Sequence, residues 1–329
     1  MEPWLPRCLD DVFAALPASA EAIAVDDGST DATLRLLRER AASELRLRVI
    51  AASHAGVSAA RNRALDAVRG RYVFFVDPDD GVEPDYFTAM VGELERSGAD
   101  TVLCGYSERE DGAETVRDVL PKANYAFGSN AEIVARYLPL ILGYSFADIR
   151  AWYGGTPLFA RREMASACRM VFRRELIESG HVRFDESVSL YEDAMFIADY
   201  LLIAKSMVTL PCPLYRVTCR NSGAMRSVPR DGVRYCRNKL ALLRKREALD
   251  FSAGGTLAPL YAGTNVLSVL EIVSFVVRRR VPLREARQVL RDYLSVPSVR
   301  AAIRAFPLSV RRPLLAASVL TLRLLGLGR

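Results

Sequence analysis

The sequence predicts an α/β fold in which a mostly parallel, Rossmann-like sheet is flanked by helices and followed by a helical, basic C-terminal extension. Three observations predict it. The first hundred residues alternate between short apolar runs and amphipathic segments, as β/α units do. The expected strand 71–76 contains the uninterrupted apolar run 72–76, as expected for a parallel strand that is covered on both faces. Residues 251–329 have a helical pattern and are rich in arginine.

The N-terminal elements follow from these runs and their boundaries. Four apolar runs predict strands, at 21–25, 47–51, 71–76 and 99–106. Three amphipathic segments predict helices, one from about Ala32 and two within 56–70 and 85–98. In the second of these helices, Ser58 is the expected N-cap and Gly70 is the expected stop signal.

The middle of the chain is less regular. Residues 110–165 combine glycines and aromatic side chains with weak periodicity, and we expect a loop at 153–159. Beyond it, the pattern predicts two helices and a strand, at 171–180, 190–206 and 207–217. The expected division is a first, catalytic domain of residues 1–226 and a second, helical and Arg-rich region of residues 227–329.

Positive charge is concentrated at the C-terminal end. The whole chain has a net charge of +6, whereas residues 251–329 hold twelve arginines and three acidic residues, a net charge of +9. Residues 1–250 therefore carry −3, and nothing in this charge indicates a nucleic-acid partner. Two histidines and six scattered cysteines, without a CxxC pair, nearly exclude a zinc cluster. We expect the cysteines to be reduced, in a cytoplasmic protein.

Two acidic clusters follow predicted strands. Asp26 and Asp27 begin "DDGSTD", and Asp77, Asp79 and Asp80 lie in "VDPDD". Because ligands of open α/β sheets bind beyond the carboxyl ends of the strands, we expect both clusters to face one crevice. Crowded carboxylates are typical ligands of Mg²⁺ or Mn²⁺, which also bind oxygens of substrate phosphates. The alternative is that Asp79 or Asp80 only caps the following turn.

Four motifs together resemble a known family. They are "VDDGSTD", "HAGVSAARNRAL", "YVFFVDPDDGVEPDYF" and "FDESVSLYEDAMF", in this order along the chain. Over about residues 1–226 the sequence resembles glycosyltransferase family 2. The resemblance implies the GT-A fold, a UDP-sugar donor and a hydroxyl acceptor, with inversion at the anomeric carbon. It also implies a role in making a bacterial cell-surface polysaccharide or glycolipid.

The resemblance assigns a first group of residues to the nucleotide sugar. Asp27 would contact the uracil base, with Asp26 beside it. Arg61, in "SAARN", would lie near the nucleotide, and Asp77 would bind the ribose hydroxyls. Asp79 would coordinate Mn²⁺ or Mg²⁺ on the diphosphate.

A second group is implied for the transfer step. Asp193, in "YEDAM", would be the catalytic base, with Glu192 next to it. An inverting transfer requires a base, because the acceptor hydroxyl loses a proton as it attacks. Acidic residues also favour a helix N-terminus, which is the structural alternative for this pair. Arg220 and Ser222, in "CRNSGAM", resemble a segment that would close over the diphosphate.

The C-terminal region holds two apolar segments, 263–280 and 311–328, each shorter than the roughly 20 residues that cross a bilayer. One interpretation is that they pack as helices. The alternative is that they lie in the membrane interface, with the arginines of residues 251–329 on anionic headgroups. The acceptor would then be a saccharide or lipid-linked saccharide, and the enzyme would be cytoplasmic or peripheral on the inner membrane face.

The first residues depart from the family pattern. "MEPWLPRCLDDV" resembles the segment that follows the first strand of the family, so we expect Met1 to be an internal start. Two alternatives to an active transferase therefore stay open. One is an inactive nucleotide-binding or scaffold relative. The other is a sugar nucleotidyltransferase, which would need a Gly-rich, basic phosphate loop.

Overall fold

The structure is a computed structural model that describes residues 1–329 with the exception of 111–115, 158–161, 189, 220–231, 278–281 and 307–329. The chain forms two compact units. The first comprises residues 1–133 and 165–227, and the second comprises 134–164 and 228–329. The expected division at residue 226 therefore needs a correction, because residues 134–164 belong to the second unit.

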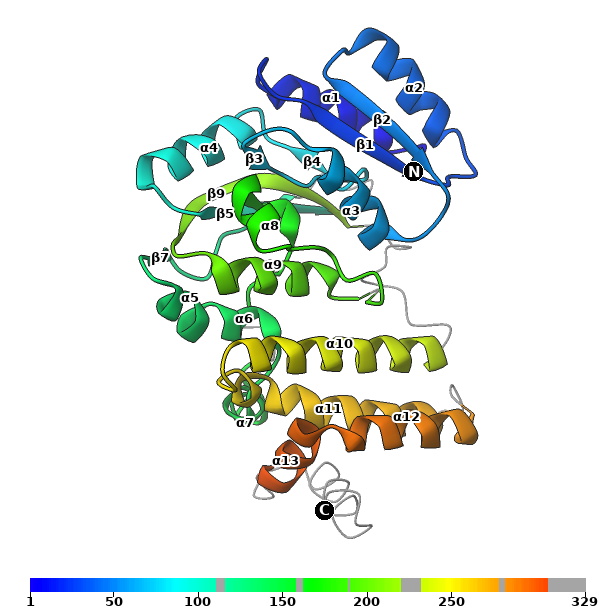
Figure 1. The fold of residues 1–329 in the computed structure, drawn as a ribbon, viewed down its shortest axis with the longest axis vertical. Coiled ribbons are helices and arrows are strands. Elements are labelled where there is room, and N and C mark those ends of the chain that lie inside the picture. Colours follow the sequence, from blue (N-terminus) through cyan, green and yellow to red (C-terminus); the bar gives the residue numbers. More distant parts are fainter. Residues whose placement is uncertain (111–115, 158–161, 189, 220–231, 278–281, 307–329) are drawn as a thin grey trace. The chain divides into compact units, whose positions relative to one another are not determined.

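The first unit begins with the predicted β/α alternation. Its first elements are α1 (Leu5–Ala15), β1 (Ala22–Asp27), α2 (Thr33–Ser43), β2 (Leu47–Ala52) and α3 (Val57–Ala67). β1 and β2 pair in parallel along their whole length and lie side by side in Figure 1. Apolar residues recur every fourth position along α1 and bury against α2 and β2. They form a small core of Leu5, Leu9, Phe13, Leu37 and Leu47.

The predicted N-cap of α3 is wrong. The helix begins at Val57, and its N-cap is Gly56, whose φ of +100° favours glycine. Ser58 is buried within the first turn. The helix ends at Ala67, before the expected stop at Gly70.

A second sheet forms the centre of this unit. Its order is β3-β8-β5-β9-β4, with β6 paired to β5 and β7 paired to β9. The strands are β3 (Tyr72–Val73), β4 (Gly81–Val82), β5 (Thr101–Glu110), β6 (Val116–Val119), β7 (Ala126–Phe127), β8 (Met170–Arg173) and β9 (Met207–Cys219). Helices and a 3₁₀ turn contact it or extend from it, namely α4 (Tyr86–Ser97), α5 (Asn130–Arg136), η1 (Ala167–Arg169), α8 (Arg174–Ser179) and α9 (Glu192–Ile203).

The expectation of a mostly parallel sheet is wrong for this second sheet. β5 and β9 are parallel, whereas the other pairs of described strands in it are antiparallel. Antiparallel neighbours need no helical crossover, so a short strand from a loop can be inserted between strands of β/α units. β8 is such a strand. It occupies the beginning of the expected helix 171–180, of which only α8 is helical.

The expected strand 71–76 is also shorter. Only Tyr72–Val73 pair, with β8, and β1 pairs with β2, so no strand in the described part of the chain joins the two sheets. The apolar run is nevertheless covered, as predicted. Phe74 contacts aromatic rings of α4, and Phe75 contacts an aromatic ring of α9.

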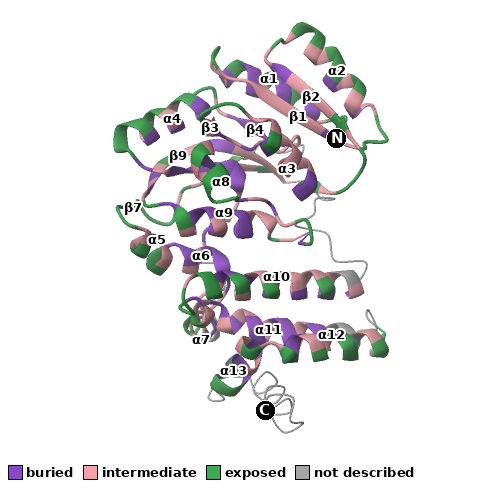
Figure 2. Cartoon of the chain, viewed as in Figure 1, coloured by how far each residue is buried: buried purple, intermediate pink, exposed green. Residues whose placement is uncertain are grey.

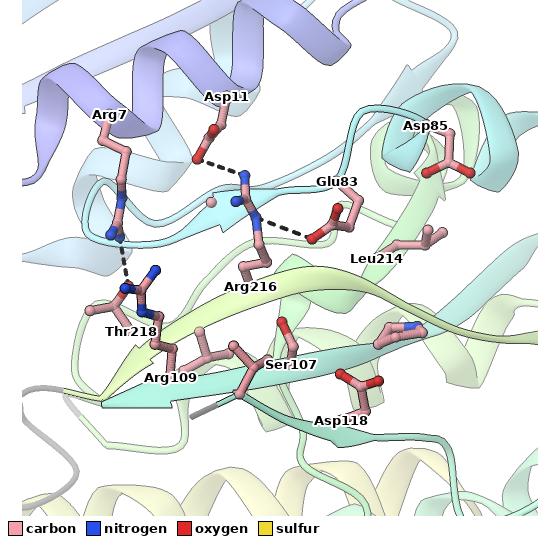
Figure 3. A pocket seen from close by; sticks show the side chains of 14 residues that line it. Arg7, Asp11, Glu83, Asp85, Ser107, Arg109, Asp118, Leu214, Arg216 and Thr218 are labelled. Carbon is pink, nitrogen blue, oxygen red and sulfur yellow. Dashed lines mark hydrogen bonds and ion pairs between the residues drawn. The ribbon is translucent and has the colours of Figure 1, made fainter. Parts of the chain in front are cut away.

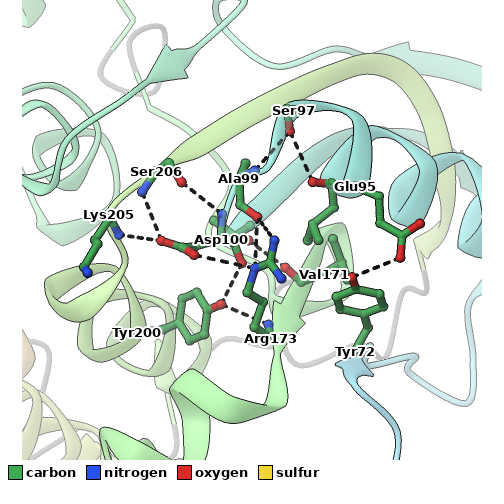
Figure 4. Close-up of polar contacts among 12 residues, drawn as sticks. Tyr72, Glu95, Ser97, Ala99, Asp100, Val171, Arg173, Tyr200, Lys205 and Ser206 are labelled. Atoms are coloured by element: carbon green, nitrogen blue, oxygen red, sulfur yellow. Dashed lines mark hydrogen bonds and ion pairs between the residues drawn. The ribbon is translucent and has the colours of Figure 1, made fainter.

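Hydrogen bonds and an ion pair link the segment before β5 to β8, to α9 and to the segment before β9 (Figure 4). Asp100 precedes β5, and its Oδ2 accepts hydrogen bonds from the backbone N of Lys205 at 2.7 Å and of Ser206 at 3.2 Å. Arg173 of β8 lies 3.5 Å from the Asp100 carboxylate. The hydroxyl of Tyr200 on α9 donates to the Asp100 carbonyl oxygen at 2.7 Å. This network fixes where β9 begins relative to β5.

In its described part the second unit is mainly helical. It contains α6 (Leu138–Leu142), α7 (Phe146–Tyr153), α10 (Gly232–Ser252), α11 (Ala258–Val277), α12 (Leu283–Ser295) and α13 (Pro297–Ala305). α11 is largely buried (Figure 2) and lies at the centre of the core. Its buried residues Val266, Val269 and Ile272 belong to one cluster with Tyr293 of α12 and Ile303 of α13.

Backbone contacts explain why residues 134–164 belong here. A Cβ atom at Gly263 of α11 would lie 2.7 Å from the carbonyl oxygens of both Tyr144 and Ser145. The adjacent Thr264 donates its backbone N–H to the Tyr144 carbonyl and accepts from the Tyr144 N–H. The segment before α7 therefore packs directly on α11.

The apolar segment 263–280 is thus helical as far as Val277, and its residues Val266, Val269 and Ile272 pack in the core of the second unit. Segment 311–328 lies outside the described residues. None of the helices in the described part of the chain combines the length and the apolar character that crossing a bilayer requires.

Candidate active site

The three carboxylates after the run 71–76 have separate partners. Asp80 turns into the protein and is 7% exposed. Its Oδ1 accepts from the backbone N of Thr218 at 2.8 Å, and its Oδ2 accepts from the hydroxyl of Tyr215 at 2.8 Å. Burial, supported by the neighbouring carboxylates, raises the pKa of Asp80 to about 7 in spite of these hydrogen bonds. Asp80 anchors its turn to β9.

Asp77 and Asp79 are less buried. The Asp77 carboxylate accepts from a terminal nitrogen of Arg61 at 2.8 Å, and its backbone N donates to the Tyr215 hydroxyl at 3.1 Å. The Asp79 carbonyl oxygen accepts from Arg7 of α1 at 3.3 Å. Both residues are thus held by long-range contacts.

Arg61 connects separate segments of the site. It projects from α3, and its side chain is 12% exposed. One terminal nitrogen donates to Asp193 at 2.5 Å and lies 3.9 Å from Glu192, while the other donates to Asp77. The guanidinium also lies over the ring of Phe184, 5.1 Å from its centroid. Three expected site residues, Asp77, Glu192 and Asp193, therefore surround the Arg61 side chain.

Glu192 and Asp193 occupy the first turn of α9. The second carboxylate oxygen of Asp193 accepts from the backbone N of Ala167 at 2.9 Å. Burial raises the pKa of Asp193, while Arg61 acts in the opposite direction. Burial and the neighbouring Asp193 raise the pKa of Glu192. A raised pKa makes a carboxylate a stronger proton acceptor, as a general base must be.

The first acidic cluster closes the loop between β2 and α3. Asp27 accepts from the backbone N of Ala55 at 2.8 Å and of Gly56 at 2.7 Å. Burial opposes ionisation of Asp27, but these bonds outweigh it and the pKa is lowered. Asp26 is 4% exposed, and its Oδ2 accepts from the backbone N of Ser29. Its buried Oδ1 has no hydrogen-bond partner in the described part of the chain.

The oxygen ligands present here suit a divalent ion that is bound to the protein through Asp79 alone. Among the described residues, no group of three or more His, Cys, Asp or Glu side chains is arranged to hold a metal. The carboxylate of Asp79 is a hard oxygen ligand on a partly exposed turn. Mg²⁺ and Mn²⁺ commonly bind through one or two carboxylates and complete their shells with water and phosphate oxygens. Arg220 and Ser222 lie outside the described residues.

Sequence reasoning missed the residues that hold the Asp77–Asp80 turn. They are Tyr215 and Thr218 of β9 and Arg7 of α1, which also donates to the Thr218 hydroxyl at 2.8 Å. Local patterns contain no signal for them, because Tyr215 and Asp80 are 135 positions apart.

A polar cleft of about 540 Å³ lies beside this turn (Figure 3). Its wall includes an ion-paired group in which Arg216 contacts Asp11 at 2.7 Å and Glu83 at 3.4 Å. Arg7 lines the cleft as well. None of the expected site residues that the structure describes lines this cleft.

Comparison with known proteins shows similarity to one family over part of the chain. The model of glycosyl transferase family 2 matches residues 2–140. The uncharacterized glycosyltransferase EpsJ of Bacillus subtilis is 27% identical over 229 residues, which are 70% of this chain and 61% of EpsJ. The succinoglycan biosynthesis protein ExoO of Rhizobium meliloti is 28% identical over 59% of this chain and 51% of its own. The chain thus spans less than two thirds of these relatives.

A solved structure has the same fold. Residues 1–349 of TarS from S. aureus, in complex with UDP-GlcNAc, superpose with a TM-score of 0.60. The match covers 97% of this chain and 84% of the TarS chain, at 20% sequence identity. The α/β architecture is therefore that of a GT-A glycosyltransferase.

Proposed function

Since residues 2–140 are a glycosyltransferase family 2 domain, we propose that the protein is an inverting transferase that moves a sugar from a UDP-sugar to an acceptor hydroxyl. One observation carries the proposal. Asp193, Glu192 and Asp77, which come from two distant segments, meet at the side chain of Arg61. A donor held at Asp77 would therefore have a carboxylate base nearby.

The roles of the residues follow from their environments. Asp193 is mostly buried at a helix start and has a raised pKa, which supports its role as the base for the acceptor hydroxyl. Asp77 is more open, with a side chain that is 39% exposed, which supports binding of ribose hydroxyls. Glu192 adds a second carboxylate beside the base.

The uridine site would lie at the end of β1. The unpartnered, buried Oδ1 of Asp26 supports a hydrogen bond from a ligand there. The carboxylate of Asp27 already accepts two backbone N–H groups, so Asp27 would act mainly by shaping the loop beside the base. The TarS structure contains UDP-GlcNAc, which supports a UDP-sugar as donor.

Asp79 would hold Mn²⁺ or Mg²⁺ on the donor diphosphate. The bound ion would neutralise charge on the departing diphosphate. Arg7 and Asp80 contribute by fixing the backbone of the turn that carries Asp79.

The acceptor would be a saccharide or lipid-linked saccharide, because ExoO is named for succinoglycan biosynthesis. The Arg-rich residues 251–329 would bring the enzyme to an anionic membrane surface. In α12, Arg284, Arg287 and Arg291 are exposed. Such a surface would suit an enzyme that is peripheral on the inner membrane face.

A thermal-shift panel tests the donor assignment. Each UDP-, GDP- and dTDP-sugar is added at equal concentration, with and without Mn²⁺. We expect a UDP-sugar to raise Tm most, and to do so more strongly with Mn²⁺, because stabilisation grows with the ratio of ligand concentration to Kd. Equal shifts for all nucleotide sugars would contradict a uridine site. UDP binding without turnover on any acceptor would favour the inactive relative.

A further inference from the structure

We infer that Arg61 is a positioning residue that joins the donor site to the catalytic base. In this role one guanidinium holds Asp77 and Asp193 in fixed register and keeps the Asp193 carboxylate directed toward the acceptor. The inference rests on the proposed roles of Asp77 and Asp193. It adds a function for Arg61 beyond contact with the nucleotide.

The geometry of the hydrogen bonds supports this role. Different terminal nitrogens of Arg61 donate to Asp193 Oδ1 at 2.5 Å and to Asp77 Oδ1 at 2.8 Å. A planar, rigid guanidinium fixes the relative position of two such acceptors, which a lysine ammonium does not. The backbone N–H of Ala167 donates to Oδ2 of Asp193, so both carboxylate oxygens accept a hydrogen bond.

Arg61 is itself immobilised by a stack of aromatic rings. Its guanidinium lies over Phe184, which stacks on Phe196 of α9 with centroids 4.1 Å apart and rings 6° from parallel. The next residue, Asn62, donates to the Phe184 carbonyl at 2.9 Å and accepts from the Phe184 N–H at 2.9 Å. Arg61 and Asn62 thus fasten the segment before α9 to α3.

The charges around Arg61 give it a second effect. The ionisable groups near Asp193 are the carboxylates of Asp77 and Glu192 and the buried thiol of Cys168. Arg61 is the cation that faces all of them in the described chain. Burial and carboxylate repulsion favour protonation of Asp193, and Arg61 opposes it. Without Arg61 the base would be protonated over a wider pH range.

The consequence is that base and donor site fail together when Arg61 is shortened. Asp77 would lose the partner that orients it toward the donor. Asp193 would lose its orientation, and its carboxyl group would be protonated over a wider pH range. A nucleotide contact alone would instead weaken donor binding and leave the ionisation of Asp193 unchanged.

The test compares Arg61→Met with the wild-type full chain. UDP release from the donor that stabilises the protein most is measured from pH 5 to 9. We expect kcat to fall at least about tenfold and its acidic limb to move to higher pH by about one unit or more, because an opposite charge has been removed. Carboxyl ¹³C NMR follows Asp193 directly, with its signal identified by its absence in Asp193→Asn. An unchanged Asp193 pKa would overturn the inference.

Two further variants keep the test decisive. Arg61→Lys retains the positive charge but lacks the planar guanidinium that binds two carboxylates at once. We therefore expect the acidic limb of its pH–rate profile to lie close to that of the wild type, but its kcat to be lower. A kcat equal to that of the wild type would overturn the positioning role, even if Arg61→Met does not fold. Arg35→Met removes an arginine from an exposed pair on α2 and is expected to change neither readout.

The proposed base and the proposed role of Arg61 can be disproved separately. If Asp193→Asn retains full activity, the proposed base is wrong. The NMR titration still reports whether Arg61 controls the ionisation of Asp193. If Asp193→Asn is inactive but Arg61→Met leaves the Asp193 titration unchanged, the proposed function stands and the inference about Arg61 is wrong.

Discussion

Asp80 is a buried carboxyl group held between Tyr215 and Thr218 of β9. Removing its charge from water is costly, so its pKa rises to about 7. The other two carboxylates of the turn are arranged differently, since Asp77 faces Arg61 and Asp79 is partly exposed. The three carboxyl groups can lie close together because Asp80 is substantially protonated near neutral pH and Asp77 is paired with Arg61.

The raised pKa of Asp80 makes folding stability depend on pH. Its stabilising contribution is complete below the unfolded pKa of about 4 and is lost as pH rises through about 7. Asp80→Asn keeps an acceptor for the Thr218 N–H but cannot ionise. We expect the variant to gain stability relative to the wild type as pH rises from 4 to 8, by about 1.4 kcal/mol for each unit of pKa difference.

Urea unfolding without divalent metal, at a series of pH values, measures this difference. Asp118→Asn, at an exposed position of β6, controls for the change in net charge. A difference between Asp80→Asn and wild type that is constant with pH would contradict the account of Asp80.

The sequence predicts the types of site residue but not their partners. The acidic clusters and the "YEDAM" motif were recognisable because each is local. The ion pair between Arg61 and Asp193 joins residues 132 positions apart, and no periodicity indicates it. The same holds for Tyr215 and Asp80. Side-chain partners at such separations are set by packing of the whole unit.

At the scale of elements, close approach decides which segments pack together. Gly263 lies within α11, where alanine would ordinarily stabilise the helix. Its missing Cβ instead gives room to the backbone of Tyr144 and Ser145. We expect Gly263→Ala to destabilise the second unit by about 1–3 kcal/mol, because backbone atoms must move to admit the methyl group.

Thermal unfolding followed by circular dichroism measures this effect. The matched control is Gly92→Ala in α4, where the added methyl group would meet no atom within 4 Å. We expect Gly92→Ala to be neutral or stabilising by up to about 1 kcal/mol. Equal Tm changes in the two variants would rule out the close contact at Gly263.

Periodicity predicts the long elements of the fold well. β1, β2, α2, α4 and β9 lie close to their expected positions, because each has a clear apolar pattern. β8 was missed, because a four-residue buried strand directly followed by a helix looks like one helical segment. The antiparallel direction of the short strands also escapes prediction, since it depends on loop paths rather than composition.

At the scale of the whole molecule, charge separates the two ends of the chain. Residues 251–329 carry +9, and the apolar face of α12 is buried within the second unit through Val289 and Tyr293. The exposed arginines of α12 can therefore contact anionic groups, while the buried Val289 and Tyr293 are not available for insertion. Attachment to a membrane would then be electrostatic.

We expect the triple variant Arg284→Gln, Arg287→Gln, Arg291→Gln to bind anionic vesicles about a hundredfold more weakly. Each arginine near an anionic surface contributes about 1 kcal/mol. Co-sedimentation of the full chain with vesicles containing phosphatidylglycerol, at low and high salt, measures the change. The control replaces Arg35, Arg38 and Arg71 of the first unit, which are also exposed. Equal losses in both triple variants would indicate a general charge effect and contradict a surface on α12.

The most direct measurement concerns Asp193. The rate of sugar transfer by Asp193→Asn is compared with that of the wild type, while UDP affinity and Tm are measured on the same preparations. The account predicts a loss of at least about a hundredfold in rate with UDP affinity and folding retained, because only the base has been removed. Transfer at the wild-type rate by a folded Asp193→Asn variant would contradict it.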